Sequence, residues 1–454
     1  MAEHRLRVAA RWGVARVGVA ALLALLLGAA ACGNGSKATP AGNPADVNGD
    51  ANATGTLHVW LQVDAQTGRK PVVDSATQAF NAKYPKVKVQ IDYQQWGDHL
   101  TKLDAALSGS QAPDVVEMGN TETTSYIANG AFADLSANKG VFDNSGTWNK
   151  GLQESCTYQG KLFCVPYYGG SRVVAYRKDM FTAAGIGAPP ASLDELMADG
   201  QKLMAKFGSD KNFSAFYMPG KFWYAALTFV NDAGGSIAKQ GSDGKWTAQL
   251  STPESIQGLT RWNNLVQKLY RGDKAIDEAN PQQYTVMAQG HVAMMYGLGW
   301  EAGSVGAPKD KGGDPALAGK VGVFPMPSAT AGQAMQSFSG GSDLAITAKS
   351  QHQNWAAAWI KEFTNTKSQQ GLVQAGNVPN TTSLLDSALS DPKLAPFAAS
   401  AKSSWFVPVD PNWSKVEKSL VLQNTLAEIA TGKVSVADGA KKMNDQVDKI
   451  LNGA

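Results

Sequence analysis

Four carboxylates could take part in acid–base chemistry. Hydrolysis of a glycosidic bond needs two carboxyl groups flanking the bond, one of them with a raised pKa. The sequence singles out no such pair, and it contains no nucleophile elbow, zinc-protease motif or phosphate-binding loop. The five histidines show no metal-ligand spacing. We therefore predict no enzyme activity, no metal and no cofactor. The carboxylates considered are Asp64, Glu117, Glu122 and Glu301.

The aromatic residues indicate a different chemistry, the binding of a sugar. A sugar presents hydroxyl groups around an apolar C–H face, so its site combines stacked rings with Asp, Asn, Gln or Arg side chains. The chain has 12 tryptophans. Trp300 is the strongest candidate, because Gly297 and Gly299 leave its face open. We therefore expect Trp300 to face a ligand.

Two cysteines predict a disulfide. Cys156 and Cys164 bracket a turn centred on Gln159 and Gly160, as the arms of a hairpin would. An even pair at this spacing in an exported protein favours a bond between them. A metal site would need two further ligands, and no histidine lies close in the sequence.

The N-terminus predicts export. Arginines up to Arg16 precede the apolar stretch 17–27, which is too short to span a bilayer as a mature helix. Small residues then lead to Cys32, as in a bacterial lipobox, although Ala29 stands where leucine is commoner. We expect a signal peptide over 1–31 and a lipid on Cys32, with plain secretion after cleavage near Ala31 as the alternative. The polar stretch 32–55 is a predicted disordered tether.

Length and charge narrow the class of protein. At 454 residues the chain exceeds one ordinary hydrophobic core, so two lobes are expected. Without the basic segment 1–31, basic and acidic side chains balance at 37 each. A neutral surface lacks the positive field that nucleic-acid binding requires, and that class is set aside.

The elements that would position these residues alternate along the chain. Strands are predicted at 56–60, 86–93 and 115–118, with single helices between them, which favours a mainly parallel sheet. Further strands are expected at 173–176, 292–295, 321–324 and 344–346. Capped helices are predicted to begin near Ser192, Thr252, Ser414 and Ser435.

The stretch 155–181 has the features of a crossing between two lobes. Pro166 is followed by Tyr167, Tyr168 and the flexible Gly169-Gly170, and then by a new strand. A hinge needs permissive backbone angles, and a ligand needs flat apolar surface. The alternative is an ordinary loop with two packed tyrosines.

Six motifs resemble the solute-binding proteins of carbohydrate ABC importers, the maltose-binding-protein-like group. They occur in that family's order across most of 56–451. They are SGSQAPDVVEMGNT (108–121), GKLFCVPYYGGSRVVAYRKDMFTAAGI (160–186), PPASLDEL (189–196), QGHVAMMYGLGW (289–300), GVFPMPS (322–328) and SFSGGSDLAITAKS (337–350).

The resemblance implies an α/β fold of the periplasmic-binding-protein type II, with two lobes that close on a ligand at a hinge. Lobe 1 would hold 56–167 with 343–376, and lobe 2 would hold 168–342 with 377–454. It implies a monomer at the outer face of the cytoplasmic membrane, attached only through its lipid. Its partners would be a sugar or oligosaccharide and the transmembrane subunits of an ABC permease.

The ligand residues that we expect follow strands or match the family's cleft positions. Arg172 could bind two sugar hydroxyls or pair with a carboxylate, and both interpretations stay open. Trp223 and Tyr224 would precede a helix beginning near 225, and Gly341 with Ser342 would let the backbone approach the ligand. The full set is Trp60, Asp64, Asn120, Thr121, Tyr167, Tyr168, Arg172, Trp223, Tyr224, Trp300, Gly341, Ser342 and Trp413.

A different solute is the main alternative to a sugar. A polyamine site would want several carboxylates around the cleft, and an iron site would want clustered tyrosines with histidine or carboxylate. A glycoside-acting enzyme is the third possibility, and it is disfavoured because the sequence singles out no pair of catalytic carboxylates.

Overall fold

The computed structural model describes residues 47, 49–391 and 394–453. The predicted signal peptide and Cys32 lie outside these residues, as does most of the predicted tether. The last tether residue, Gly55, begins strand β1 (Gly55–Gln62). Among the described residues, no helix combines the length and apolar character needed to cross a bilayer.

The first sheet has six strands of mixed direction. β1 runs parallel to its two neighbours, whereas β14 runs antiparallel to both of its own. The prediction of a mainly parallel sheet is therefore wrong, because strands that re-enter this sheet after long excursions run in the opposite direction. In order, the strands are β15 (Val378–Pro379), β6 (Cys164–Gly170), β14 (Gly340–Ile346), β3 (Val115–Gly119), β1 and β2 (Val87–Gln94).

The second sheet has four strands, and it is mixed as well. β11 pairs in parallel with β8 and antiparallel with β7. In order, the strands are β12 (Val321–Phe324), β7 (Val173–Arg177), β11 (Val292–Gly297) and β8 (Ser214–Tyr217). Three short pairs complete the strands: β4 (Thr157–Tyr158) with β5 (Lys161–Leu162), β9 (Ala238–Gln240) with β10 (Trp246–Ala248), and β13 (Ser337–Phe338) with β16 (Ser404–Trp405).

Each sheet has its own helices and its own core. One large cluster of buried apolar side chains draws on residue 47 and on 57–167 and 344–372, and the other on 174–338 and 405–451. We call these groups lobe 1 and lobe 2. The helices of lobe 1 are α1 (Val63–Thr67), α2 (Lys70–Lys83), α3 (His99–Ser108), α4 (Thr123–Ala128), α5 (Lys150–Ser155), α12 (Gln353–Thr364) and α13 (Thr366–Gln374).

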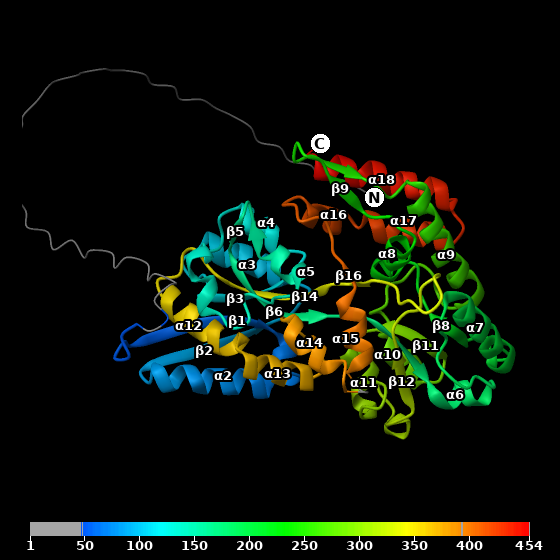
Figure 1. The fold of residues 1–454 in the computed structure, drawn as a ribbon, viewed down its shortest axis with the longest axis horizontal. Helices are drawn as coiled ribbons and strands as arrows, with labels where there is room; N and C mark the ends of the chain where they lie inside the picture. Colours follow the sequence, from blue (N-terminus) through cyan, green and yellow to red (C-terminus); the bar gives the residue numbers. More distant parts are fainter. Residues whose placement is uncertain (1–46, 48, 392–393, 454) are drawn as a thin grey trace, which may run out of the picture. The chain divides into compact units, whose positions relative to one another are not determined.

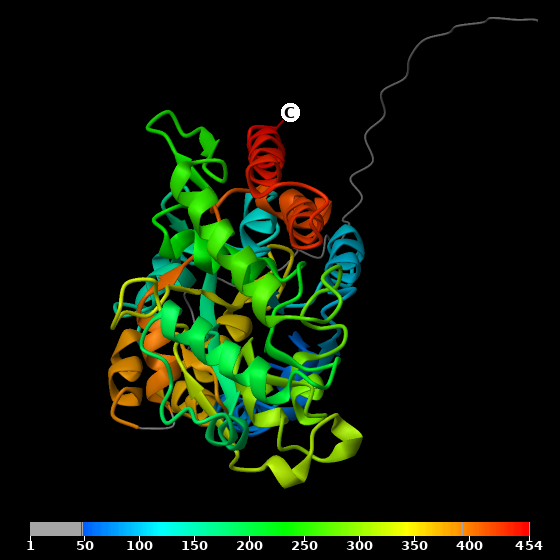
Figure 2. The ribbon, with the colours of Figure 1, turned by 90° about the vertical axis from the view of Figure 1, so that its right-hand side faces the viewer.

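The C-terminal helices return to lobe 2. Figures 1 and 2 show α17 and α18 in red beside the green helices α8 and α9, and these helices are in contact. The helices of lobe 2 are α6 (Lys178–Ala183), α7 (Leu193–Phe207), α8 (Trp223–Asp232), α9 (Pro253–Leu269), α10 (Gln283–Ala288), α11 (Gly299–Ser304), α16 (Trp413–Ser419), α17 (Val421–Ala430) and α18 (Val436–Leu451).

The chain passes between the lobes three times within the described residues. The first crossing joins β6 to β7 through Ser171 and Arg172, and the second joins β13 to β14 through Ser339. The third leaves β15 and runs through α14 (Thr382–Ala388) and α15 (Ala395–Lys402) to β16. The predicted crossing at 155–181 is therefore confirmed.

Three of the four predicted helix caps are confirmed. Ser192, Thr252 and Ser435 each accept a hydrogen bond from the backbone N–H three residues on. The cap expected at Ser414 is wrong, because α16 already includes Trp413, and Asn412 is the residue before the helix.

Candidate ligand-binding site

The carboxyl ends of three strands meet at one edge of the lobe 1 sheet. β1 is followed by Asp64 in α1, β2 by a loop that holds Trp96, and β3 by Asn120 and Thr121. Because neighbouring parallel strands end at the same edge, distant stretches of sequence come together there. Gly119 ends β3 beside Trp96, since a Cβ added at Gly119 would lie 3.5 Å from the indole ring.

Hydrogen bonds orient the groups around Trp96. Its indole N–H donates to the Asp64 carboxylate at 3.0 Å. The two ring nitrogens of His99 lie 2.8 Å from the carbonyl oxygen of Trp96 and 2.9 Å from Glu122 Oε2. Both partners are acceptors, so both nitrogens donate only when the imidazole is protonated. Burial alone would lower the pKa of His99, but the hydrogen bond and the charge of Glu122 outweigh it and raise this pKa.

A buried guanidinium lies next to Asp64. Arg69 is 4% exposed, its guanidinium carbon lies 4.2 Å from the centre of the Tyr168 ring, and its Nη2 lies 3.7 Å from Asp64 Oδ2. Glu117 is fully buried on β3 and accepts a hydrogen bond from the backbone of Gln62 at 2.8 Å. Burial raises the pKa of Glu117, against the opposing charge of Arg69. Because an arginine side chain stays protonated, Arg69 holds a permanent positive charge beside Asp64.

On lobe 2, Arg172 joins a ring to a carboxylate. Its guanidinium carbon lies 4.3 Å from the centre of the half-buried Tyr224 ring, and its Nη2 lies 3.9 Å from Glu278 Oε1. A carboxylate therefore lies within ion-pair distance of Arg172, and its binding of sugar hydroxyls stays a prediction. Burial raises the pKa of Glu278 to about 7, because it outweighs the charge of Arg172. The helix of Tyr224 begins at Trp223, two residues earlier than expected.

Trp223 packs against Tyr224, and Trp413 in turn packs against Trp223. The centre of the Trp223 ring lies 4.1 Å from the centre of the Tyr224 ring and 6.2 Å from that of the Trp413 ring. Trp223 is 5% exposed and Trp413 is 1% exposed, so both are packed in the lobe 2 core. The Trp413 indole N–H donates to Glu417 Oε1 at 2.9 Å, which orients that carboxylate.

The two lobes make direct contact through these groups. The Thr121 hydroxyl, on lobe 1, donates to Glu417 Oε2 on lobe 2 at 3.4 Å. The Asn120 amide donates to the carbonyl oxygen of Ser339, in the second crossing, at 2.9 Å. Burial, together with the charge of Glu122, raises the pKa of Glu417 to about 7. These contacts therefore link charged and aromatic groups of the two lobes.

Trp300 is the most exposed of the predicted residues with large apolar side chains, at 51%. It lies in α11, edge-on to Tyr284, with ring centres 6.0 Å apart. The reason given for its openness needs correction. A Cβ at Gly299 would lie 2.9 Å from the carbonyl oxygen of Gly376, so this glycine permits packing against lobe 1. Glu301 holds the start of α11 by accepting a hydrogen bond from Leu298 N at 2.7 Å.

Most of the remaining predicted residues serve the scaffold or lie elsewhere, whereas Tyr168 is half-buried beside Arg69. The fully buried Tyr167 packs against Phe363 in the lobe 1 core, and Tyr168 contacts the Ser342 hydroxyl at 3.2 Å. Gly341 has φ of 141°, and a Cβ there would overlap the Tyr168 carbonyl oxygen, so its glycine allows β14 to pair with β6. Trp60 lines a separate shallow groove with Asp92, Gln94 and Lys102.

Trp96 and His99 are the site residues that the sequence reasoning missed. A usable signal existed, because Trp96 lies three residues after the predicted strand 86–93 and precedes Gly97. The rule that selected Asp64 and Asn120, a position just after a strand, selects Trp96 as well.

The predicted disulfide is confirmed. The sulfur atoms of Cys156 and Cys164 are bonded at 2.08 Å, and the β4–β5 hairpin turns at Gln159 and Gly160 with positive φ. Among the described residues, the one group of potential metal ligands that lie close together consists of these cysteines and Asp343. Because both thiols are consumed by the disulfide, this group does not form a metal site.

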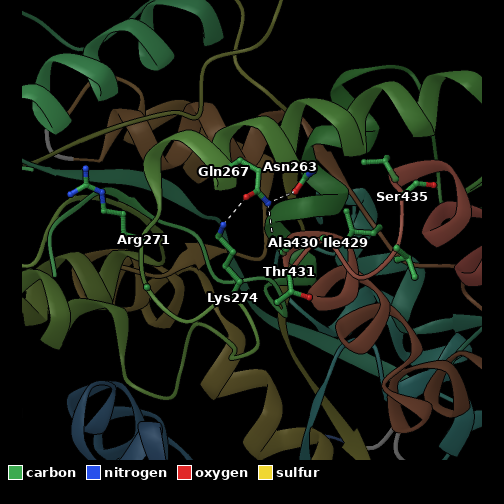
Figure 3. Close-up of a pocket in the computed structure, with 12 residues that line it drawn as sticks. Asn263, Gln267, Arg271, Lys274, Ile429, Ala430, Thr431 and Ser435 are labelled. Carbon is green, nitrogen blue, oxygen red and sulfur yellow. Dashed lines mark hydrogen bonds between the residues drawn. The ribbon is translucent and has the colours of Figure 1, made fainter. Parts of the chain in front are cut away.

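A second pocket lies apart from the predicted residues. This pocket has a volume of about 580 Å³ and lies between α9 and the turn that joins α17 to α18. Figure 3 shows the residues that line it. Its polar groups are engaged with one another, since Lys274 donates to Gln267, and Gln267 donates to the carbonyl oxygen of Ala430, both at 2.7 Å. We assign no ligand to this pocket.

Comparison with known proteins identifies related sequences. Residues 65–370 match the bacterial extracellular solute-binding protein family. The chain is also 32% identical over 440 residues to the diacetylchitobiose binding protein DasA of Streptomyces coelicolor, an overlap of 96% of this chain and 98% of that protein.

Solved structures share the fold. The GacH receptor of Streptomyces glaucescens, solved without ligand and with acarbose, has a TM-score of 0.74 at 22% identity and covers 88% of this chain and 100% of its own. The cyclic alpha-maltosyl-1,6-maltose binding protein of Arthrobacter globiformis has a TM-score of 0.71 at 20% identity, with the same coverage of 88% and 100%. These similarities confirm the predicted two-lobed α/β fold.

Proposed function

Because this chain belongs to the bacterial extracellular solute-binding proteins, we propose that it binds a sugar or short oligosaccharide between its lobes and presents it to the permease of an ABC importer. The observation that carries the proposal is the contact of Thr121 with Glu417, which brings rings and carboxylates of both lobes together. Membership of a solute-binding family confirms that the chain is a binding protein and not an enzyme.

Among the predicted residues, we propose that six with accessible side chains touch the sugar. Aromatic faces would stack on the C–H face of the sugar, and charged or hydroxyl groups would bind its hydroxyls. Asn120, Tyr167, Trp223, Ser342 and Trp413 are buried and would support them. The proposed contacts are Asp64, Thr121, Tyr168, Arg172, Tyr224 and Trp300.

We further propose the attachment and the lobe boundaries. The lipobox-like run supports a lipid on Cys32, which would hold the protein at the outer face of the cytoplasmic membrane. Lobe 1 would comprise 56–167 with 343–376, and lobe 2 would comprise 168–342 with 377–454. Rotation about the three crossings would then open and close the site.

A thermal-shift screen tests the proposal. The panel comprises diacetylchitobiose, suggested by the relative's name, together with mono-, di- and oligosaccharides, polyamines and iron. A ligand at 100 times its Kd adds about 2.7 kcal/mol to the free energy of unfolding, so a true ligand gives a clear rise in Tm. A rise with a carbohydrate, verified by calorimetric titration, supports the proposal. A rise with a polyamine or iron and with no carbohydrate would refute it.

A further inference from the structure

We infer that Trp96 is the ring on which a sugar stacks in lobe 1, an inference that rests on the proposed function and extends its binding site. Three large apolar side chains are exposed among the described residues: Trp96, Trp300 and Leu420. Trp300 and Leu420 belong to lobe 2. Trp96 is therefore the exposed platform that the described part of lobe 1 offers.

Trp96 is held ready for a ligand by three neighbours. Its N–H is bonded to Asp64 at 3.0 Å, the His99 ring stands edge-on to it with centres 5.2 Å apart, and it lies beside Gly119 at the end of β3. A ring in a fixed pose loses little conformational freedom on binding. Trp96 nevertheless keeps 38% of its surface exposed. This combination of fixed pose and exposed apolar surface suits a binding platform better than a packing residue.

The groups beside the indole indicate the chemistry of the ligand. The Asp64 side chain is 57% exposed, so its carboxylate can accept a hydrogen bond from a ligand hydroxyl while it holds the indole. Apolar C–H groups above a ring and hydroxyl donors at its edge are what a pyranose presents. The geometry therefore points to one pyranose unit lying on Trp96, with one of its hydroxyls donating a hydrogen bond to the Asp64 carboxylate.

The position of Trp96 links it to the lobe contact. The Glu122 carboxylate is hydrogen-bonded to His99, and His99 is hydrogen-bonded to the backbone of Trp96. Thr121, the neighbour of Glu122 in the sequence, donates a hydrogen bond to Glu417 on lobe 2. A sugar on Trp96 would thus lie next to the place where the lobes meet. Loss of the Trp96 ring should increase the dissociation rate of the sugar, because lobe 1 would then bind the sugar without an aromatic platform.

The test compares three variants of the full mature chain by calorimetric titration with diacetylchitobiose, or with the carbohydrate of the panel that binds most tightly. Trp96→Ala removes the platform, whereas Trp96→Phe keeps a ring but loses the bond to Asp64. Trp246→Ala is the matched control, because the Trp246 indole N–H also donates to an aspartate, Asp410, at 3.0 Å. Tm is measured for each variant.

Trp96→Ala should weaken binding roughly 30-fold or more, the threshold of an interface hot spot, and Trp96→Phe should retain most of the affinity. Trp246→Ala should stay within about threefold of the wild type. If the wild type binds and Trp96→Ala binds equally well, this inference alone fails. Equal losses in the Ala and Phe variants, or in the control, would also overturn it. If the wild type binds no carbohydrate, the proposed function fails first and this inference fails with it.

Discussion

The hydroxyl of Thr121 lies 3.4 Å from the carboxylate of Glu417, although 296 residues separate the two in the sequence. Thr121 follows β3 in lobe 1, and Glu417 lies in α16 of lobe 2. The Trp413 indole orients the same carboxylate from within lobe 2. This contact is therefore a direct link between the lobes at the proposed binding site.

Thr121→Val, which keeps the shape but loses the hydroxyl, should weaken ligand binding. A hydrogen bond to a charged group contributes about 1.5–3 kcal/mol, and the length of this one places it at the low end, or roughly tenfold in affinity. Thr121→Ser retains a hydroxyl and should bind within about twofold to threefold of the wild type. Titration calorimetry on the three proteins checks this. Equal affinities for Val and Ser would show that the contact does not help to close the lobes.

Trp300→Ala should weaken sugar binding while the fold survives. Truncation of a stacking ring costs about 2–4 kcal/mol, or roughly 30- to 1,000-fold in affinity. Trp262 is fully buried on α9, and Trp262→Ala should instead lose about 3–5 kcal/mol of stability. Affinity and Tm are measured for both variants. A collapse of Tm in Trp300→Ala, or an affinity within twofold of the wild type, would assign Trp300 to packing.

Asp343 should make the protein less stable as pH rises. Burial raises the pKa of this fully buried carboxyl to about 7, whereas an unfolded chain has an ordinary aspartate. The unfolded state therefore loses its proton first, and stability falls from about pH 4 to pH 7 and is then level. Asp343→Asn cannot ionise and can still accept the Thr123 bond. The Tm of Asp343→Asn minus the Tm of the wild type should therefore increase from pH 5 to pH 8. A difference in Tm that does not change with pH would contradict the raised pKa.

Removal of the disulfide should destabilise lobe 1. Cys156 and Cys164 are eight positions apart, and closure of a short loop stabilises a fold by about 2–4 kcal/mol. The Cys156→Ser/Cys164→Ser double variant should unfold at a lower denaturant concentration, with the wild type in reductant as a comparison. An unchanged unfolding midpoint would mean that the hairpin is held by its packing alone.

Cys32→Ala should release the protein from the membrane. The small residues before Cys32 favour lipidation, and a residue without a thiol cannot be lipidated. Cell fractionation with immunoblotting measures the membrane-bound and released fractions of Cys32→Ala and of the wild type. Equal membrane retention of Cys32→Ala and the wild type would argue against the lipid.

Local patterns predicted the scaffold well. The strand 115–118, the caps at Ser192 and Thr252 and the hairpin between the cysteines follow from side chains a few residues apart, and the structure contains all of them. The candidates Asp64 and Thr121 also came from a local rule, the position just after a strand. These features could be predicted because the interactions that create them are short in sequence.

Only the tertiary structure decided what these residues contact. β14 enters the first sheet antiparallel between β3 and β6, so the direction of this strand depends on pairing across more than 150 residues. Burial separates Tyr167 in a core from Tyr224 at the lobe junction, although both are aromatic residues in similar local settings. Burial and the nearby charge of Glu122 raise the pKa of Glu417 to about 7, against the lowering effect of the hydrogen bonds from Trp413 and Thr121. Charge and burial depend on neighbours in space, and local sequence patterns do not specify those neighbours.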